Sequence, residues 1–277
     1  MNPETFQGPE NMADLPHFDY SALDRPDISQ RVFHPRPEWG QFATTRANDI
    51  SIPVDDQIAI GARFHLVGKQ APNILFFHGN GEIVADYDDL APVYNRMGIN
   101  FLPVDYRGYG RSGGEPTVSA MMNDCHTIYH FTRKWLSDNG YTGPFVVMGR
   151  SLGSASALEL ASAYGDKIDG LIIESGFALA EPLLKLLGVD LHSLDFTESE
   201  GFRNLDKMEQ FSKPVLIIHA EFDHIIPYSD ALQFYKASPS PDKTLLKIPG
   251  ANHNDIFSRG LVEYMSSVKS FVGRLKP

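Results

Sequence analysis

A serine between glycines, with a strand pattern before it and a helix pattern after it, is the most chemically informative feature of the chain. Ser151 lies in residues 149–153, which read G-x-S-x-G, and the apolar run 145–148 precedes it. Small and helix-forming residues follow over 154–163. A serine hydroxyl is a weak nucleophile at neutral pH unless a base lies beside it, and a tight strand-to-helix turn exposes the hydroxyl to base and substrate. The pattern predicts that Ser151 is a nucleophile.

A candidate base and a candidate acid each follow a predicted strand further along the chain. Asp223 comes just after the apolar run 214–220, and His253 lies in a turn-rich loop after the run 244–248. A nucleophilic serine needs a histidine as general base and a carboxylate that holds the histidine tautomer. The carboxyl ends of parallel strands form the ligand-binding edge of an open sheet. We therefore expect Ser151, Asp223 and His253 to converge at that edge.

Glu174, which follows the apolar run 171–173, is a competing candidate for the acid. Asp223 is favoured because its loop has the layout strand–x–x–Asp–x–x–x–Pro. Arg150, next to the nucleophile, is expected to be buried, to pair with a carboxylate and to steady the turn.

Four separated segments of the chain resemble the α/β-hydrolase superfamily of serine hydrolases. They are HGNGE at 78–82, DYRGYGRS at 105–112, the turn at Ser151, and the loops that carry Asp223 and His253. The resemblance covers about residues 50–275 and is most similar to the branch with an HGNG-type oxyanion loop, which includes bacterial esterases and acyl-protein thioesterases. It implies an α/β fold with a mostly parallel eight-stranded sheet, helices on both faces and a small cap after the sixth strand.

An oxyanion hole follows from the serine motif and from the resemblance together. Leu152 comes directly after the nucleophile at the start of a helix, where backbone N–H groups have no helical partner. The resemblance implies that the backbone N–H of Asn80 is the second donor. Removing one such donor costs on the order of 3 kcal/mol of transition-state stabilisation. His78 is expected to support this loop, and Asp105 to shape a loop behind the site.

The chain divides into an N-terminal extension and a hydrolase domain that contains an insert. Residues 1–45 are rich in proline and aromatic side chains, and we expect them to pack on the core; lining the site entrance is the open alternative. Residues 46–277 form the α/β-hydrolase domain, with 176–212 as a small helical cap. The cap supplies three candidate substrate-pocket residues: Phe177, Leu183 and Leu187. Packing of its leucines on the sheet, away from any ligand, is an equal alternative.

Charge and cysteine content disfavour several classes of protein. The net charge is −11, whereas nucleic-acid binding needs clustered lysine and arginine. Cys125 is the single cysteine, so no intramolecular disulfide is possible, which fits a reducing compartment. The sequence shows no signal-peptide pattern and no apolar run long enough to span a membrane. We expect a cytoplasmic protein with no integral membrane segment, no bound metal and no cofactor; the oligomeric state stays open.

The predicted function is a serine hydrolase that cleaves carboxylic ester or thioester bonds through an acyl-enzyme, with a small-molecule or acyl-group substrate. A peptidase, a perhydrolase or a C–C hydrolase on the same fold are alternatives. The alternative of a different class is a non-catalytic ligand-binding protein with the hydrolase fold. It is disfavoured because such proteins often lose one member of the Ser–His–Asp set, and all three are present here.

Overall fold

The computed structural model describes residues 18–38 and 48–276. The remaining part of the predicted extension 1–45, including Pro16, His17 and Trp39, lies outside the described residues.

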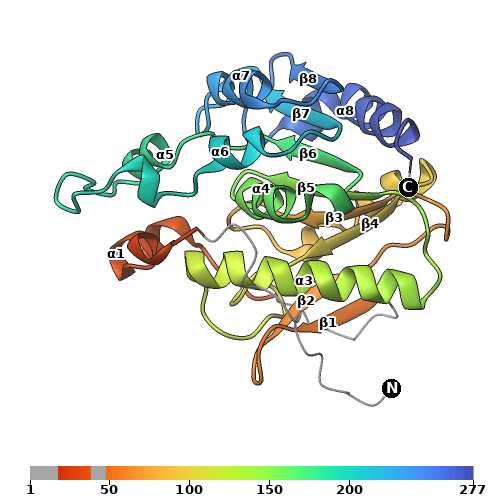
Figure 1. Ribbon diagram of the computed structural model, residues 1–277, viewed down its shortest axis with the longest axis horizontal. Helices are drawn as coiled ribbons and strands as arrows, with labels where there is room; N and C mark the ends of the chain where they lie inside the picture. The colour runs from red at the N-terminus through yellow and green to blue at the C-terminus, as the bar shows by residue number, and fades with distance from the viewer. Residues whose placement is uncertain (1–17, 39–47, 277) are drawn as a thin grey trace.

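One eight-stranded sheet forms the centre of the domain (Figure 1). Its strands are β1 (Asp49–Pro53), β2 (Ala59–Arg63), β3 (Asn73–Phe77), β4 (Asn100–Val104), β5 (Phe145–Arg150), β6 (Gly170–Glu174), β7 (Val215–Ala220) and β8 (Lys243–Ile248). They lie side by side in the order β1-β2-β4-β3-β5-β6-β7-β8. β1 and β2 form an antiparallel hairpin, β2 runs antiparallel to β4, and the other neighbours are parallel. The predicted fold class is confirmed.

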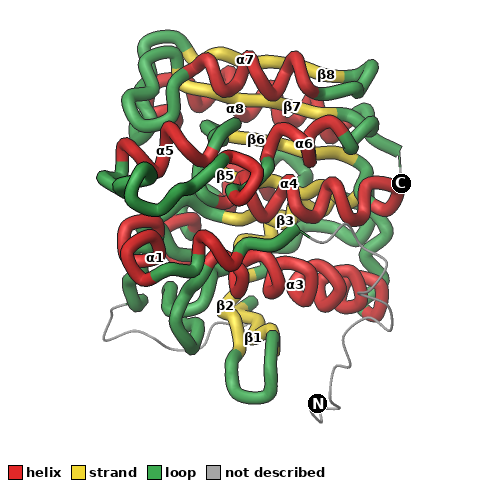
Figure 2. The backbone as a smooth tube through the Cα atoms, turned by 60° about the vertical axis from the view of Figure 1, so that its left-hand side comes forward, coloured by secondary structure: helices red, strands yellow, loops and turns green. Residues whose placement is uncertain are grey.

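Helices cover both faces of the sheet, and short 3₁₀ turns connect several elements (Figure 2). The helices are α1 (Pro26–Val32), α2 (Ala91–Arg96), α3 (Val118–Asp138), α4 (Gly153–Tyr164), α5 (Ala180–Leu186), α6 (Asn204–Glu209), α7 (Tyr228–Ala237) and α8 (Ile256–Gly273). Within the described ranges, none of them is long and apolar enough to cross a membrane.

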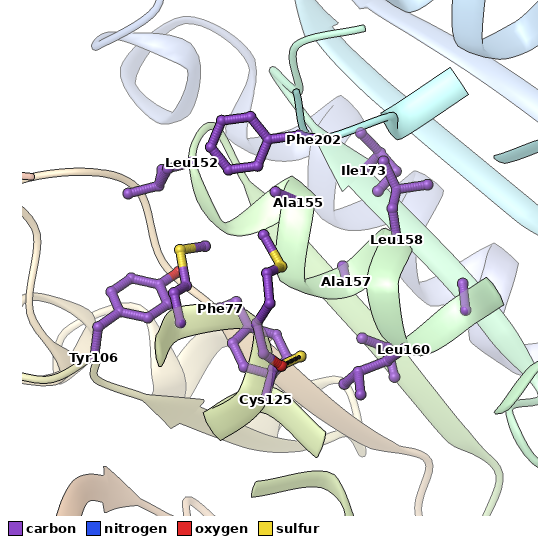
Figure 3. Packing of buried hydrophobic residues seen from close by; sticks show 14 of the residues in the cluster. Phe77, Tyr106, Cys125, Leu152, Ala155, Ala157, Leu158, Leu160, Ile173 and Phe202 are labelled. Carbon is purple, nitrogen blue, oxygen red and sulfur yellow. Dashed lines mark hydrogen bonds between the residues drawn. The ribbon is translucent and has the colours of Figure 1, made fainter. Parts of the chain in front are cut away.

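Alternating side chains of the buried strands make two separate cores. In β3, Leu75 and Phe77 belong to the core beneath α3, α4 and α7, whereas Ile74 and Phe76 belong to the core beneath α2 and α8. Successive side chains of a strand point to opposite faces, so a continuously apolar strand must be covered on both sides. Figure 3 shows the first core, where Ala155 and Leu158 of α4 lie near Ile173 of β6.

The order of the strands places two loops next to each other at the carboxyl edge of the sheet. The chain leaves β3 for β4 on one side and later returns as β5 on the other side of β3. Phe77 is paired in register with Gly149, so the loops that follow β3 and β5 start as neighbours. Such a switch point is where α/β sheets bind ligands.

Two further segments lie at this end of the molecule. The insert 176–212 carries α5 and α6, and α6 packs against α4. The N-terminal segment 18–38 buries Leu23, Ile28 and Val32 in the first core. Its helix α1 lies beside α5 in both views (Figures 1 and 2), where the Arg31 guanidinium donates to the Leu187 carbonyl at 3.0 Å.

The approach of α4 to β3 predicts that Gly153 cannot be replaced. A Cβ atom at position 153 would lie 2.1 Å from the carbonyl oxygen of Phe77. Because backbone atoms cannot swing aside, Gly153→Ala should destabilise the protein by at least about 3 kcal/mol, which lowers Tm by about 6 °C or more in a chain of this size. Gly68→Ala is the control, since its nearest neighbour would be an ordinary contact at 3.9 Å. Equal Tm values for the two variants, measured by calorimetry, would contradict this packing.

Candidate active site

Ser151 occupies a sharp turn between β5 and α4. Its φ angle is 49°, in the left-handed region that residues with a Cβ seldom adopt. Such strained residues gather at functional sites. The turn is held by the Ser151 N–H, which donates to the Glu174 carbonyl at 2.9 Å. A Cβ at Gly149 would lie 2.2 Å from the Gly153 carbonyl oxygen, so the turn tolerates only glycine there.

The three side chains singled out as nucleophile, base and acid form one hydrogen-bonded chain. His253 Nε2 lies 3.0 Å from Ser151 Oγ, and His253 Nδ1 lies 2.7 Å from Asp223 Oδ2. They come from the loops after β5, β7 and β8, which the parallel strands bring to one edge. Asp223 and His253 are 8% and 5% exposed, so water competes little for these contacts.

The environment of Asp223 fixes both its charge and the histidine tautomer. Burial opposes ionisation of the carboxyl, but hydrogen bonds from His253 and from the N–H groups of Ile226 and Ile225 outweigh it and lower the pKa of Asp223. An ionised carboxylate only accepts hydrogen bonds, so Nδ1 of His253 must carry the proton. Nε2 then presents its lone pair to the serine hydroxyl, as a general base requires.

Glu174, the competing carboxylate, is fully buried and engaged elsewhere. It accepts from Arg150 Nη1 at 2.8 Å and from the Tyr264 hydroxyl at 2.6 Å. Burial raises the pKa of Glu174, and the positive charge of Arg150 opposes that rise. Both carboxylate oxygens therefore have partners, and the geometry favours Asp223 as the partner of the histidine.

Arg150 connects the serine turn to two other loops. Besides Glu174, its guanidinium donates to Glu82 Oε1 at 2.8 Å and to the carbonyl oxygen of His253 at 3.0 Å. The expectation of a buried, carboxylate-paired arginine agrees with this geometry.

Glu82 completes this connection and was not singled out by the sequence. Its Oε2 accepts from the Gly79 N–H at 2.7 Å and from the Tyr87 hydroxyl at 2.5 Å. Burial opposes its ionisation, but Arg150 and the Tyr87 hydrogen bond lower the pKa of Glu82 to about 2. The only signal in the sequence is a carboxylate at the end of the HGNGE segment, three residues after Gly79.

The two expected oxyanion donors lie on neighbouring loops: Asn80 follows β3, and Leu152 lies between β5 and α4. Among the described residues, no protein acceptor is recorded for the backbone N–H of Asn80 or of Leu152. His78 is fully buried below the loop: its Nε2 lies 3.1 Å from Asp105 Oδ1, and its carbonyl accepts from the Tyr106 hydroxyl at 2.6 Å. These contacts match the supporting roles expected of His78 and Asp105.

The three pocket candidates of the insert differ in exposure. Phe177 is 1% exposed and packs edge-on against Phe202, with ring centroids 5.0 Å apart. Leu183 and Leu187 are half-buried at the margin of the core. A side chain as covered as Phe177 offers no surface to a substrate in this conformation, and the pocket role of all three stays a prediction.

Comparison with known families and sequences gives two results. The family model described as serine aminopeptidase, S33, matches residues 68–192 and 201–258. The α/β-hydrolase domain-containing protein 17C of Xenopus tropicalis is 30% identical over 210 residues, covering 74% of this chain and 62% of that protein. The human protein 17B is 29% identical over 210 residues, covering 73% and 66%. The chain thus spans less than two thirds of the length of these relatives.

Solved structures of esterases and lipases are similar in fold. The structure of ferulic acid bound to Est1E from Butyrivibrio proteoclasticus has a TM-score of 0.67 at 21% identity, covering 80% of this chain and 97% of that one. The Pyrococcus furiosus esterase Pf2001 gives 0.69 at 20% identity, covering 87% and 98%. The Paleococcus ferrophilus monoacylglycerol lipase gives 0.61 at 18%, covering 77% and 98%. At these identities the likeness shows a shared fold.

The Glu82 carboxylate gives the site a measurable dependence of stability on pH. A glutamate whose pKa is lowered by folding stabilises the protein above its ordinary value of 4.5, and this contribution is lost as the pH falls toward about 2. Glu82→Gln should therefore lower the free energy of unfolding by about 2 kcal/mol at pH 7, and by much less at pH 3.

Urea denaturation at both pH values measures this difference. Glu263→Gln, at an exposed position of α8, is the control and should change stability by less than about 0.5 kcal/mol at either pH. A deficit in Glu82→Gln that is equal at pH 7 and pH 3 would show that ionisation of Glu82 contributes nothing.

Proposed function

The chain belongs to the serine aminopeptidase S33 family of α/β-hydrolase-fold serine hydrolases, and from that premise we propose that it hydrolyses carboxylic ester or thioester bonds at Ser151. The observation that carries the proposal is the unbroken hydrogen-bonded chain from Ser151 Oγ through His253 to Asp223. A hydroxyl, an imidazole and an ionised carboxylate in this order are the requirements of acyl transfer through a covalent intermediate.

In the first half of the proposed reaction, Ser151 Oγ attacks the carbonyl carbon while His253 Nε2 takes the hydroxyl proton. Asp223 stabilises the imidazolium that forms, and its lowered pKa keeps it ionised for this task. The backbone N–H groups of Leu152 and Asn80 are the proposed donors to the oxyanion. His253 then protonates the departing alcohol or thiol, which leaves an acyl group on Ser151.

In the second half, water replaces the alcohol or thiol. His253 takes a proton from the water as it attacks the acyl carbonyl, and the same two N–H groups stabilise the second oxyanion. Collapse of this intermediate breaks the bond to Ser151 Oγ, and His253 returns its proton to the serine. The products are a carboxylic acid and the free enzyme.

Amide hydrolysis is the second candidate, because the family model is described as an aminopeptidase. An aminopeptidase needs a carboxylate that faces the substrate's ammonium group. The carboxylates that hydrogen bonds place around the serine turn are already engaged: Glu82 and Glu174 by Arg150, and Asp223 by His253. This arrangement supports the ester or thioester assignment over the peptidase.

Substitution of the proposed nucleophile and of the two candidate acids tests the mechanism. Ser151→Ala should abolish hydrolysis of p-nitrophenyl butyrate and labelling by a fluorophosphonate, with an unchanged circular dichroism spectrum. Asp223→Asn should lower kcat by about 10⁴-fold, because it imposes the wrong histidine tautomer. Glu174→Gln is the matched control and should retain far more activity. Equal losses of kcat in Asp223→Asn and Glu174→Gln would move the acid role to Glu174.

Rates of the wild-type enzyme on leucine p-nitroanilide and on butyryl thioesters, measured side by side, separate a peptidase from an enzyme that cleaves esters or thioesters.

The insert predicts a dependence of rate on acyl length. If Leu183 and Leu187 contact the acyl chain, replacing either by alanine should raise KM for p-nitrophenyl octanoate several-fold and leave KM for the acetate unchanged. Leu186→Ala is the control, because Leu186 lies between them in sequence and its side chain is mostly exposed. Identical KM profiles for the three variants across a series of acyl lengths would remove the two leucines from the pocket.

A further inference from the structure

Residues 34–38 of the N-terminal segment lie across the loop that carries Asn80. The Arg36 guanidinium donates to the Gly81 carbonyl at 2.8 Å and pairs with Asp86. The Arg36 carbonyl accepts from the Gly110 N–H at 2.9 Å, and Pro37 forms a parallel bridge with Gly110. The segment is therefore joined to the loops after β3 and β4 by backbone and side-chain contacts.

His34 makes two of the hydrogen bonds that fix the Asn80 side chain. Its backbone N–H lies 2.9 Å from Asn80 Oδ1, and its Nδ1 lies 2.8 Å from Asn80 Nδ2. The Tyr109 hydroxyl donates to Asn80 Oδ1 at 2.7 Å. Because a backbone N–H can only donate, the amide oxygen must face it, and the amide NH₂ must donate to the imidazole. Nδ1 of His34 is therefore unprotonated in this arrangement.

The loop that carries Asn80 is open at Gly81 and is restrained by hydrogen bonds. Asn80 lies between Gly79 and Gly81, and Gly81 has φ at +75°. A Cβ built on Gly81 would meet no heavy atom within 4 Å, so open space surrounds the loop at that residue. Glycines add backbone freedom. The loop is restrained because the Gly79 N–H donates to Glu82, and because Arg36 and His34 donate to Gly81 and Asn80.

The anchorage of His34 is separate from its contacts with Asn80. The preceding residues Ile28, Val32 and Phe33 are buried in the first core, whereas His34 itself is exposed. The buried side chains of α1 and Phe33 therefore fix the backbone of segment 18–38. The His34 imidazole contacts Asn80 but does not pack in the core. A change of this side chain should leave the fold intact.

We propose that His34 is a positioning residue for the oxyanion hole: through the Asn80 side chain, it holds the Asn80 backbone N–H where the oxyanion forms. This inference rests on the proposed function, since the N–H matters only if Ser151 attacks a carbonyl group. Displacing a catalytic group by about 1 Å can cost on the order of 100-fold in rate. His34 is one of several hydrogen-bond partners of this loop, so loss of its side chain should slow the chemical step by less than that amount.

Kinetics on p-nitrophenyl butyrate with the full-length chain test this role. His34→Ala should lower kcat by about 3-fold to 5-fold, because the Asn80 amide loses one exposed partner and keeps the backbone N–H at position 34 and the Tyr109 hydroxyl. KM should stay within about twofold, and Tm within about 2 °C of the wild type, since the side chain is exposed. His34→Asn should recover most of the rate, because an amide oxygen can accept from Asn80 Nδ2 much as the imidazole Nδ1 does.

Gln30→Ala, at an exposed position of α1, is the matched control within the same segment and should keep the wild-type kcat. A His34→Ala enzyme with wild-type kcat would overturn the inference, as would a loss that appears only in KM, which would make His34 a substrate contact. If Ser151→Ala lacks activity in the same assay, the proposed function stands when the role of His34 fails. If Ser151→Ala retains full activity, both fail together.

Discussion

The buried guanidinium of Arg150 is the charge on which the geometry of the site depends. An unpaired cation in the protein interior costs several kcal/mol, so its partners must assemble around it when the chain folds. These partners come from three places: Glu82 from the loop after β3, Glu174 from the end of β6, and the His253 carbonyl from the loop after β8. Arg150 itself precedes the serine. One charge therefore joins the serine turn, the loop that carries His253 and the loop after β3 into a single unit.

A second buried polar cluster joins the periphery to the helix that follows Ser151. The Glu159 carboxylate on α4 accepts from the Tyr20 hydroxyl at 2.5 Å and pairs with Lys207 Nζ at 2.8 Å. Burial opposes its ionisation, but the charge of Lys207 lowers the pKa of Glu159 to about 2. Tyr20 belongs to the N-terminal segment and Lys207 to the insert. Both peripheral segments are thus tied to α4, the helix that follows the serine turn.

The residues of the proposed chemistry could be predicted because each follows a recognisable strand pattern: the apolar runs 145–148 and 214–220, and the short run 244–248 at the edge of the sheet. For Ser151, Asp223 and His253, the local pattern fixes the strand end, and the parallel sheet brings strand ends together. The partners of Arg150 could not be assigned in this way, because charge pairing between β3 and β6 loops depends on distances that no local pattern records. The contact of His34 with Asn80 was missed for the same reason: it lies in a proline-rich segment without periodicity. In the insert, apolar composition alone did not distinguish buried Phe177 from half-buried Leu187.

The contacts around the Ser–His–Asp set are stronger than those between α1 and α5. The serine turn, the imidazole and the oxyanion loop are held by buried charges, whose loss is costly. Helices α1 and α5 are joined by an exposed hydrogen bond from Arg31 to the Leu187 carbonyl. Such a bond contributes about 1 kcal/mol or less to the free energy of unfolding. Side chains where these two helices meet can therefore change with little effect on the Ser–His–Asp geometry. Under the proposed function, acyl-length preference would depend on Leu183 and Leu187 and chemical competence on the charges around Arg150, so the two properties should be separable by substitution.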